Sequence, residues 1–121
     1  MGLGTRDRVV GWGLVLGPPL VALAKVLTTD PPWRLQLFED DAAYYLGVAR
    51  NVAAGHGSTF TGLLETNGYH PLWMLLLVPV AWLVDRPADL VVAVVALHGV
   101  LWAWSVREAL ALGREIGRAH V

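Results

Sequence analysis

The run "VVGWGLVLGPPLVALAKVL", Val9 to Leu27, is the first of three apolar stretches, and its length indicates the fold class. A helix of about 20 apolar residues is long enough to cross the hydrocarbon core of a bilayer. The composition agrees, since 55% of the residues are hydrophobic and only 16% are charged, against roughly 25% charged in soluble domains. We therefore expect an all-α integral membrane protein with about three transmembrane helices, at residues 9–27, 69–84 and 90–106.

The first apolar run also permits a second interpretation, a cleaved signal peptide. Arg6 and Arg8 supply a basic leader, and residues 22–24 read Ala-Leu-Ala, a small-x-small cleavage pattern. Pro18 and Pro19 interrupt the apolar run, however, and two more apolar runs follow, so we favour an uncleaved span. Such a span tolerates prolines where neighbouring helices satisfy the carbonyl groups that they free.

Basic residues ahead of the first run predict the orientation of the chain. Arg6 and Arg8 place the N-terminus in the cytoplasm by the positive-inside rule. The loop at residues 28–68 is then extracytoplasmic, and residues 85–87 form a tight cytoplasmic turn between the second and third spans. Trp102 is expected at the outer end of the third span, within an aromatic belt.

The 121 residues leave room for one domain, which we place at residues 1–114 as the N-terminal part of a multi-spanning membrane domain. The last residues, Glu115 to Val121, read "EIGRAHV" and resemble the translation of a common sequencing-library adapter. We expect them to be a non-native tail, the alternative being a genuine short polar tail. The chain has no cysteine, which excludes disulfides and thiolate chemistry, and its net charge of -1 gives no reason to expect nucleic-acid binding.

A loop of this length without secondary structure is unusual, so residues 28–68 should contain a helix. The segment "DDAAYYLGVARNVAAG" predicts an amphipathic helix on the outer membrane surface, with Asp40 as N-cap and Gly55 as C-terminal stop. Its apolar stripe at helical spacing comprises Ala42, Tyr45, Leu46, Ala49, Val52 and Ala53. The opposite face carries Asp40, Tyr44, Gly47 and Asn51.

Two adjacent acids at a helix start raise the question of what the second one does. Capping is the ordinary role of such an acid, and it uses one carboxylate. Asp41 projects about 100° around the helix from Asp40, so the two side chains are not interchangeable. A carboxylate beside a membrane can act as a general base towards a hydroxyl or amine, or can hold a divalent metal ion. We expect Asp40 to cap the helix and Asp41 to be the functional acid, with a divalent metal possible at Asp41.

The stretch "DDAAYYLGVARNVAAGHGSTF", followed by "TNGYHPLW", resembles the first outer loop of the GT-C membrane glycosyltransferases of the glycosyltransferase 39 type. These include protein O-mannosyltransferases and the lipid A aminoarabinose transferase. The resemblance implies a multi-spanning enzyme of the bacterial inner membrane that takes a sugar from a polyprenyl-phosphate carrier, with an essential acid at the start of an interfacial helix. The family pattern matches Asp41, Tyr45, Ala49 and Arg50, which favours Asp41 as catalyst and Asp40 as support. It also implies that this N-terminal fragment alone is inactive.

Four further residues are candidate substrate-binding groups. Arg50 suits bidentate phosphate contacts, although it could equally pair with an acid or a lipid headgroup. Tyr45 enters through the match to the family pattern. His70 can contact an acceptor or simply precede a helix-starting proline, and Asn67 belongs to an Asn-Gly turn, with substrate contact as its second role.

The expected partners are a polyprenyl-phosphate-linked sugar donor and membrane lipids, and the sequence identifies neither the sugar nor the acceptor. Two other classes of function remain open. One is a transporter or export subunit, whose ionisable groups normally lie within the spans near the midplane. The other is a non-catalytic membrane scaffold, in which the paired acids only cap a helix.

Overall fold

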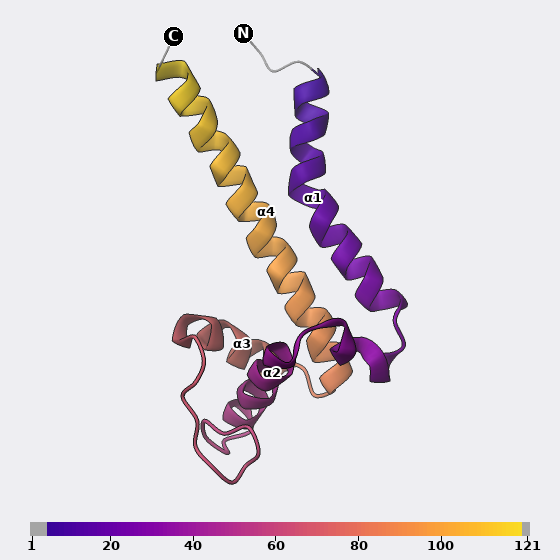
Figure 1. Ribbon diagram of the computed structural model, residues 1–121, viewed down its shortest axis with the longest axis vertical. Helices are drawn as coiled ribbons and strands as arrows, with labels where there is room; N and C mark the ends of the chain where they lie inside the picture. The colour runs from indigo at the N-terminus through magenta and orange to yellow at the C-terminus, as the bar shows by residue number, and fades with distance from the viewer. Residues whose placement is uncertain (1–4, 120–121) are drawn as a thin grey trace. The chain divides into compact units, whose positions relative to one another are not determined.

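The computed structural model describes residues 5–119, and helices dominate them (Figure 1). The helical elements are α1 (Thr5–Thr28), the 3₁₀ helix η1 (Pro31–Leu37), α2 (Asp40–Ala53), α3 (Pro71–Leu83) and α4 (Pro87–Ala119). The extended structure within this range is an isolated antiparallel bridge between Thr59 and Glu65. The expectation of an all-α chain is therefore confirmed.

The chain divides into two compact units, which we describe separately. The first unit combines most of α1 with most of α4, as Met1–Lys25 and Val95–Val121. The second unit is the continuous segment Val26–Val94, which contains η1, α2 and α3 together with the adjoining ends of α1 and α4.

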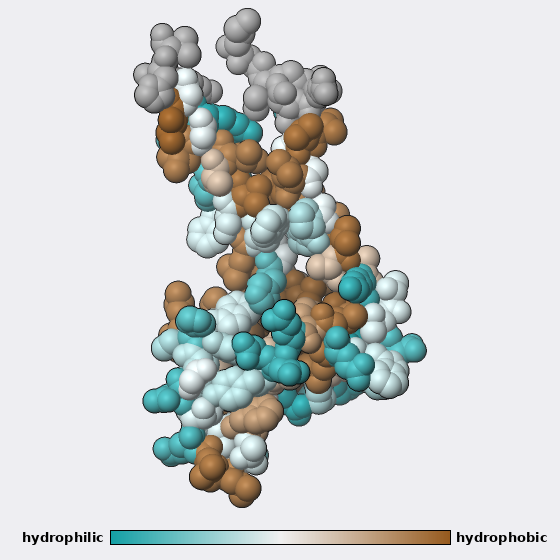
Figure 2. All heavy atoms as spheres, in the orientation of Figure 1, coloured by the Kyte–Doolittle hydropathy of each residue, from teal (hydrophilic) through white to brown (hydrophobic). Residues whose placement is uncertain are grey.

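Two helices are long and apolar enough to cross a membrane, over Arg8–Thr28 in α1 and Pro87–Gly117 in α4. Only 11% and 22% of their most apolar windows are buried inside the protein, whereas the core helix of a soluble protein is mostly buried. Hydrophobic side chains are accordingly visible along the surfaces of both helices (Figure 2). Because α1 lies near the N-terminus, a signal sequence would pass the same test of length and apolarity.

The expected second span forms a shorter helix than a crossing needs. Helix α3 begins at Pro71, as the proline at a helix start predicts, but it has 13 residues. At 1.5 Å per residue it is about 20 Å long, against about 30 Å of hydrocarbon. The three-span count is therefore not confirmed. The third run lies within α4, which starts earlier and ends later than residues 90–106 and has 33 residues.

Within the first unit, α1 and α4 pair in antiparallel order around the proline pair of α1. The indole Nε1 of Trp102 donates a hydrogen bond to the carbonyl oxygen of Leu14 at 3.2 Å. An unbroken helix would bond that oxygen to the N–H of residue 18, which is a proline and has none. Further along, a Cβ on Gly99 would lie 3.0 Å from Pro19 Cβ, so this glycine lets the helices approach closely. A neighbouring helix therefore satisfies the freed carbonyl of Leu14.

This hydrogen bond corrects the expected role of Trp102. The sequence pattern placed this residue in an aromatic belt at the outer end of a span. In the structure it lies midway along α4, which extends from Pro87 to Ala119, and its polar nitrogen binds the proline-interrupted backbone of α1. The shorter span predicted from hydropathy put the residue near an end that the helix does not have.

The second unit is built on the packing of α2 against α3. Its buried hydrophobic side chains come from both of these helices and from the first turns of α4. They are Leu46, Val48, Ala49, Met74, Leu77, Ala81, Leu90 and Val91, and Val26 at the end of α1 is buried as well. Leu46 and Ala49 belong to the predicted stripe of α2, but the fully buried Val48 lies outside it. The apolar face of α2 is thus rotated relative to the prediction, since α3 and α4 together cover it.

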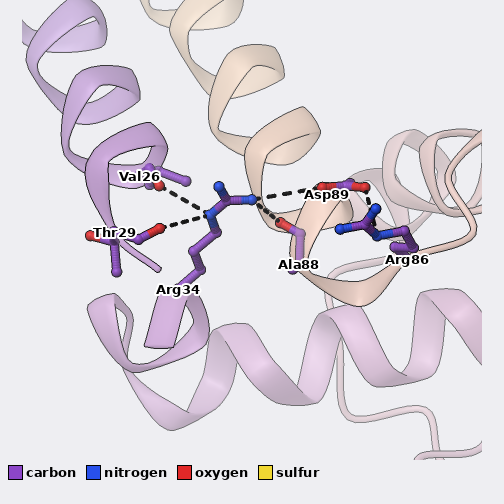
Figure 3. A network of polar contacts seen from close by, with 6 residues as sticks. All are labelled: Val26, Thr29, Arg34, Arg86, Ala88 and Asp89. Carbon is purple, nitrogen blue, oxygen red and sulfur yellow. Dashed lines mark hydrogen bonds and ion pairs between the residues drawn. The ribbon is translucent and has the colours of Figure 1, made fainter. Parts of the chain in front are cut away.

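Arg34 of η1 makes polar contacts with the end of α1 and with the start of α4 (Figure 3). Its Nε donates to the carbonyl oxygens of Val26 at 3.1 Å and Thr29 at 3.2 Å, both at the end of α1. Its Nη1 donates to the carbonyl of Ala88 at 3.3 Å and lies 3.7 Å from the carboxylate of Asp89, in the first turn of α4. The side chain is only 12% exposed. The carbonyl of Val26 also accepts the N–H of Thr29 at 3.3 Å, and Arg34 supplies a further donor where the helix ends.

Replacing Arg34 with Met should destabilise the second unit more than any exposed arginine would. The substitution keeps the apolar stem but removes all the donors, and hydrogen bonds involving a charged group contribute about 1.5–3 kcal/mol. We expect a loss of about that size in the free energy of unfolding, measured by denaturant titration of the full chain in detergent micelles. Arg86→Met is the matched control, because Arg86 also bonds Asp89 (3.2 Å) but is 73% exposed. Equal stability of the two variants would contradict the role of Arg34.

Candidate functional site

The acid pair begins helix α2, but not in the register expected. The N-cap is Glu39, whose backbone is extended (φ -68°, ψ 161°) and whose side chain makes no capping hydrogen bond. Asp40 and Asp41 are the first two helical residues. The prediction that Asp40 caps the helix is therefore wrong, because the extended backbone enters the helix one residue earlier. Both carboxylates still lie in the first turn, where the helix dipole favours negative charge.

Neither of these carboxylates is used to hold the fold. Both side chains are exposed, and across residues 5–119 neither forms a hydrogen bond or an ion pair with another described residue. An acid that capped the helix or paired with a base would have its oxygens occupied. Asp40 and Asp41 can therefore accept hydrogen bonds, or a proton, from a polar molecule that approaches from solution.

Two tyrosines one turn further along α2 hold the segment before α3 against the acidic end of the helix. The hydroxyl of Tyr45 accepts a hydrogen bond from the backbone N–H of His70 at 2.9 Å. The hydroxyl of Tyr44 is hydrogen-bonded to that of Thr66. Residues four apart share a helix face, so Tyr45 lies on the same face as Asp41. The structure thus docks the backbone of His70 on the face of α2 that also carries Asp41, one turn beyond that acid.

Asn67 belongs to the same segment, in a turn closed by the hydrogen bond from the N–H of Tyr69 to its carbonyl at 2.9 Å. We refer to Asp40, Asp41, Tyr45, Asn67 and His70 as the acidic-end site. These are five of the six residues predicted from the sequence, and they come from one helix end and the turn that docks on it. The tyrosine hydroxyls act here as structural ties, a role that the sequence did not reveal.

Arg50, the sixth predicted residue, lies elsewhere. It is nine residues beyond Asp41, which corresponds to about 13 Å along the helix and about 180° around it. Its side chain lines a small pocket of about 120 Å³ with apolar neighbours that include Leu35, Leu46 and Leu90. A single sugar phosphate cannot contact both Asp41 and Arg50 in this geometry. The guanidinium that the resemblance implies for the donor phosphate is therefore not beside the predicted catalyst.

The face of α2 predicted to be polar and open instead holds the loop that follows the helix. The side-chain amide of Asn51 donates to the carbonyls of Thr59 at 2.7 Å and Phe60 at 3.0 Å. A Cβ on Gly47 would lie 2.7 Å from the ring of Phe60, so only glycine leaves room for this ring where it lies. The sequence analysis did not identify Gly47 and Asn51 as supports of the site. The signal was available, because both residue types have low helix propensity and they lie one turn apart inside a helix.

The end of α2 follows the prediction. Gly55 has a φ of 80°, the left-handed conformation that glycine adopts without strain. Its N–H bonds the carbonyl of Val52 at 3.0 Å, and the N–H of His56 bonds the carbonyl of Asn51 at 2.9 Å. This pair of bonds is a Schellman motif, and Gly55 stops the helix as expected.

Metal binding at Asp41 has limited support from protein ligands. Residues 5–119 hold no group of three or more His, Asp or Glu side chains arranged to share a metal ion. Asp40 and Asp41 supply two carboxylates in sequence, whereas divalent cations take six or more oxygen ligands. A cation at Asp41 would therefore need most of its ligands from water, substrate or further protein.

Comparison with known proteins found no relative: no family model, no curated protein and no solved structure matches this chain. The function is therefore inferred from the residues of the acidic-end site, their geometry and the motif resemblance given above.

Replacing Asn51 with Asp should release the loop from α2. A carboxylate cannot donate to the carbonyls of Thr59 and Phe60, and each lost hydrogen bond costs about 1 kcal/mol. We expect hydrogen exchange at the amides of Gly62 and Thr66, which bond Thr59 and Ser58 within this loop, to accelerate by about tenfold or more. Gln36→Glu, the same amide-to-acid change at an exposed position, should leave both rates unchanged. Unaltered exchange in the Asn51 variant would show that the loop does not depend on this side chain.

Proposed function

We propose that this chain is the N-terminal part of a membrane glycosyltransferase that moves a sugar from a polyprenyl-phosphate donor to an extracytoplasmic acceptor. The observation that carries the proposal is the state of the acid pair. Two adjacent carboxylates begin a helix whose later residues are hydrogen-bonded to the surrounding loop. Neither carboxylate forms a hydrogen bond or an ion pair with another described residue. The resemblance of this segment to the GT-C enzymes implies an essential acid at such a helix start.

The arrangement of the two long helices supports an outward-facing site. The antiparallel pairing of α1 and α4 in the first unit brings the start of one near the end of the other. If both cross the membrane, residues 29–86 lie on one side of it. Arg8 near the start of α1, and Arg107 and Arg114 near the end of α4, then favour a cytoplasmic location for both ends. In this topology α3 rests on the outer side with α2.

In the proposed reaction Asp41 is the general base. The acceptor's hydroxyl oxygen or amine nitrogen attacks the anomeric carbon of the donor sugar, and its proton passes to the Asp41 carboxylate. The bond between the anomeric carbon and the phosphate oxygen breaks, and polyprenyl phosphate leaves with the electron pair. Asp40 supports the site electrostatically, and the turn at Asn67 to His70 contributes polar groups beside it.

Stabilisation of the leaving phosphate falls to groups other than Arg50, which lies on the opposite side of α2. In the proposal these cationic groups belong to parts of the parent enzyme that this chain does not include. The isolated chain is accordingly expected to be inactive, because an oxyanion without nearby positive charge leaves the barrier high.

The test is an Asp41→Asn variant of the uninterrupted parent protein, assayed in membranes for transfer from a polyprenyl-phosphate-linked sugar. General-base catalysis contributes about 10²–10⁴-fold, so transfer should fall by at least about 100-fold at unchanged expression. Asp30→Asn is the control, since Asp30 is an exposed acid just before η1 whose side chain makes no capping bond.

Wild-type turnover by the Asp41 variant would refute the assignment of the base. Unimpaired function of a variant with both Asp40 and Asp41 changed to Ala would favour a scaffold instead. Uptake of a solute by vesicles containing the parent, with no sugar transfer, would favour a transporter.

A further inference from the structure

A second polar site lies in the first unit, whereas the acid pair belongs to the second unit. Helices α1 and α4 line an open pocket of about 290 Å³ there. Its lining residues are Arg8, Gly11, Trp12, Val15, Arg107, Leu110 and Arg114. Every one of them belongs to α1 or α4, so the pocket depends only on the pairing of these two helices.

Helical spacing explains why these residues face one another. The other lining residues of α1 lie three, four and seven positions after Arg8, which places them on one face. Arg107, Leu110 and Arg114 form the corresponding face of α4. Gly11 contributes no side chain, and a Cβ there would just touch Leu110 at 4.0 Å. The pocket is therefore a hollow left by a glycine between two facing stripes.

All the charged groups that line the pocket are positive. The lining holds three guanidinium groups and no carboxylate. Arg107 contacts Glu108 at 2.8 Å, but both side chains are largely exposed, and such pairs contribute little. Arginine presents several donors in a planar fork that matches phosphate oxygens. The chemistry of the pocket thus selects a phosphate rather than a cation or a neutral polar group.

The apolar part of the lining indicates that this phosphate is carried by a lipid. Val15 and Leu110 form the apolar part of the lining, and Trp12, which also lines the pocket, is 62% exposed. Arginines next to a tryptophan at the end of a membrane-length helix are typical of the headgroup level of a bilayer. A free phosphate would use the charges and leave this apolar wall in contact with water.

We propose that this pocket binds the phosphate headgroup of an anionic glycerophospholipid, with its acyl chains along the apolar faces of α1 and α4. The lipid headgroup neutralises the clustered arginines and stabilises the pairing of the two helices. Basic pockets between membrane helices bind anionic headgroups in this way. The proposal requires that the two helices enter a membrane, but it is independent of the glycosyltransferase reaction and of Asp41.

The test uses the full chain in detergent micelles, titrated with phosphatidylglycerol or phosphatidylcholine and analysed by native mass spectrometry for retained lipid. The wild type should retain phosphatidylglycerol preferentially. Each arginine near the surface contributes about fivefold to anionic-lipid binding, so a variant with Arg107→Gln and Arg114→Gln should lose about 25-fold of this preference. Arg86→Gln removes one charge just before the start of α4, about 30 Å along the helix axis from Arg107, and should keep the preference.

A variant with Arg107→Lys and Arg114→Lys separates charge from folding, and it should keep most of the preference while the Gln variant loses it. Equal retention of the two lipids by the wild type would overturn the proposal, as would full retention by the Gln variant. Displacement of the lipid by glycerol 3-phosphate at matching concentration would also overturn it, because the site would then recognise a soluble phosphate.

Discussion

The hydrogen bonds of the Arg34 guanidinium are the constraint on which the second unit depends. A helix leaves its last carbonyl groups without partners inside the helix, and the 3₁₀ helix η1 begins at Pro31, shortly after α1 ends at Thr28. Arg34 bonds two of these terminal carbonyls and, with the same planar group, a carbonyl and a carboxylate at the start of α4. The end of one long helix and the start of the other are thereby fixed to η1, and the intervening chain closes as a loop. Helices α2 and α3 pack within that closed loop, and their mutual packing supplies its apolar core.

This closure gives the acid pair a defined setting. Helix α2 is stopped by the Schellman motif at Gly55, held along one face by Asn51 and the following loop, and tied near its start by Tyr44 and Tyr45. The supporting groups therefore use their hydrogen bonds on the fold, while Asp40 and Asp41 use none within residues 5–119. A site of this kind keeps its carboxylates available and their positions restricted, which is the arrangement that general-base catalysis needs.

Local signals in the sequence predicted a good part of this structure. The long apolar runs, the helix start at Pro71, the stop at Gly55 and the acids in the first turn of α2 all depend on neighbouring residues, and all are present. The features that were missed depend on partners far along the chain. Trp102 bonds Leu14, and Arg34 bonds Ala88, and neither spacing leaves a periodic trace. Apolarity alone also does not give the length of a helix, so residues 69–84 predict a span whereas α3 has 13 residues. The N-cap of α2 is Glu39 and not Asp40, a difference of one residue. It is set by backbone angles that either acidic residue can adopt.

In the proposed topology α1 and α4 both cross the membrane, and residues 29–86 between them lie on its outer side. Because the chain has no cysteine, single cysteines report their location without background. Three exposed positions suit this test. Leu63 lies in the loop after α2, Asp85 lies just before α4 and Gly113 lies near the end of α4, and each is changed to Cys in turn. In intact cells expressing the full chain, a membrane-impermeant maleimide should label Leu63→Cys and Asp85→Cys, and should label Gly113→Cys only after permeabilisation. Labelling of Asp85→Cys only after permeabilisation would mean that α3 crosses the membrane, and it would contradict the paired-helix topology.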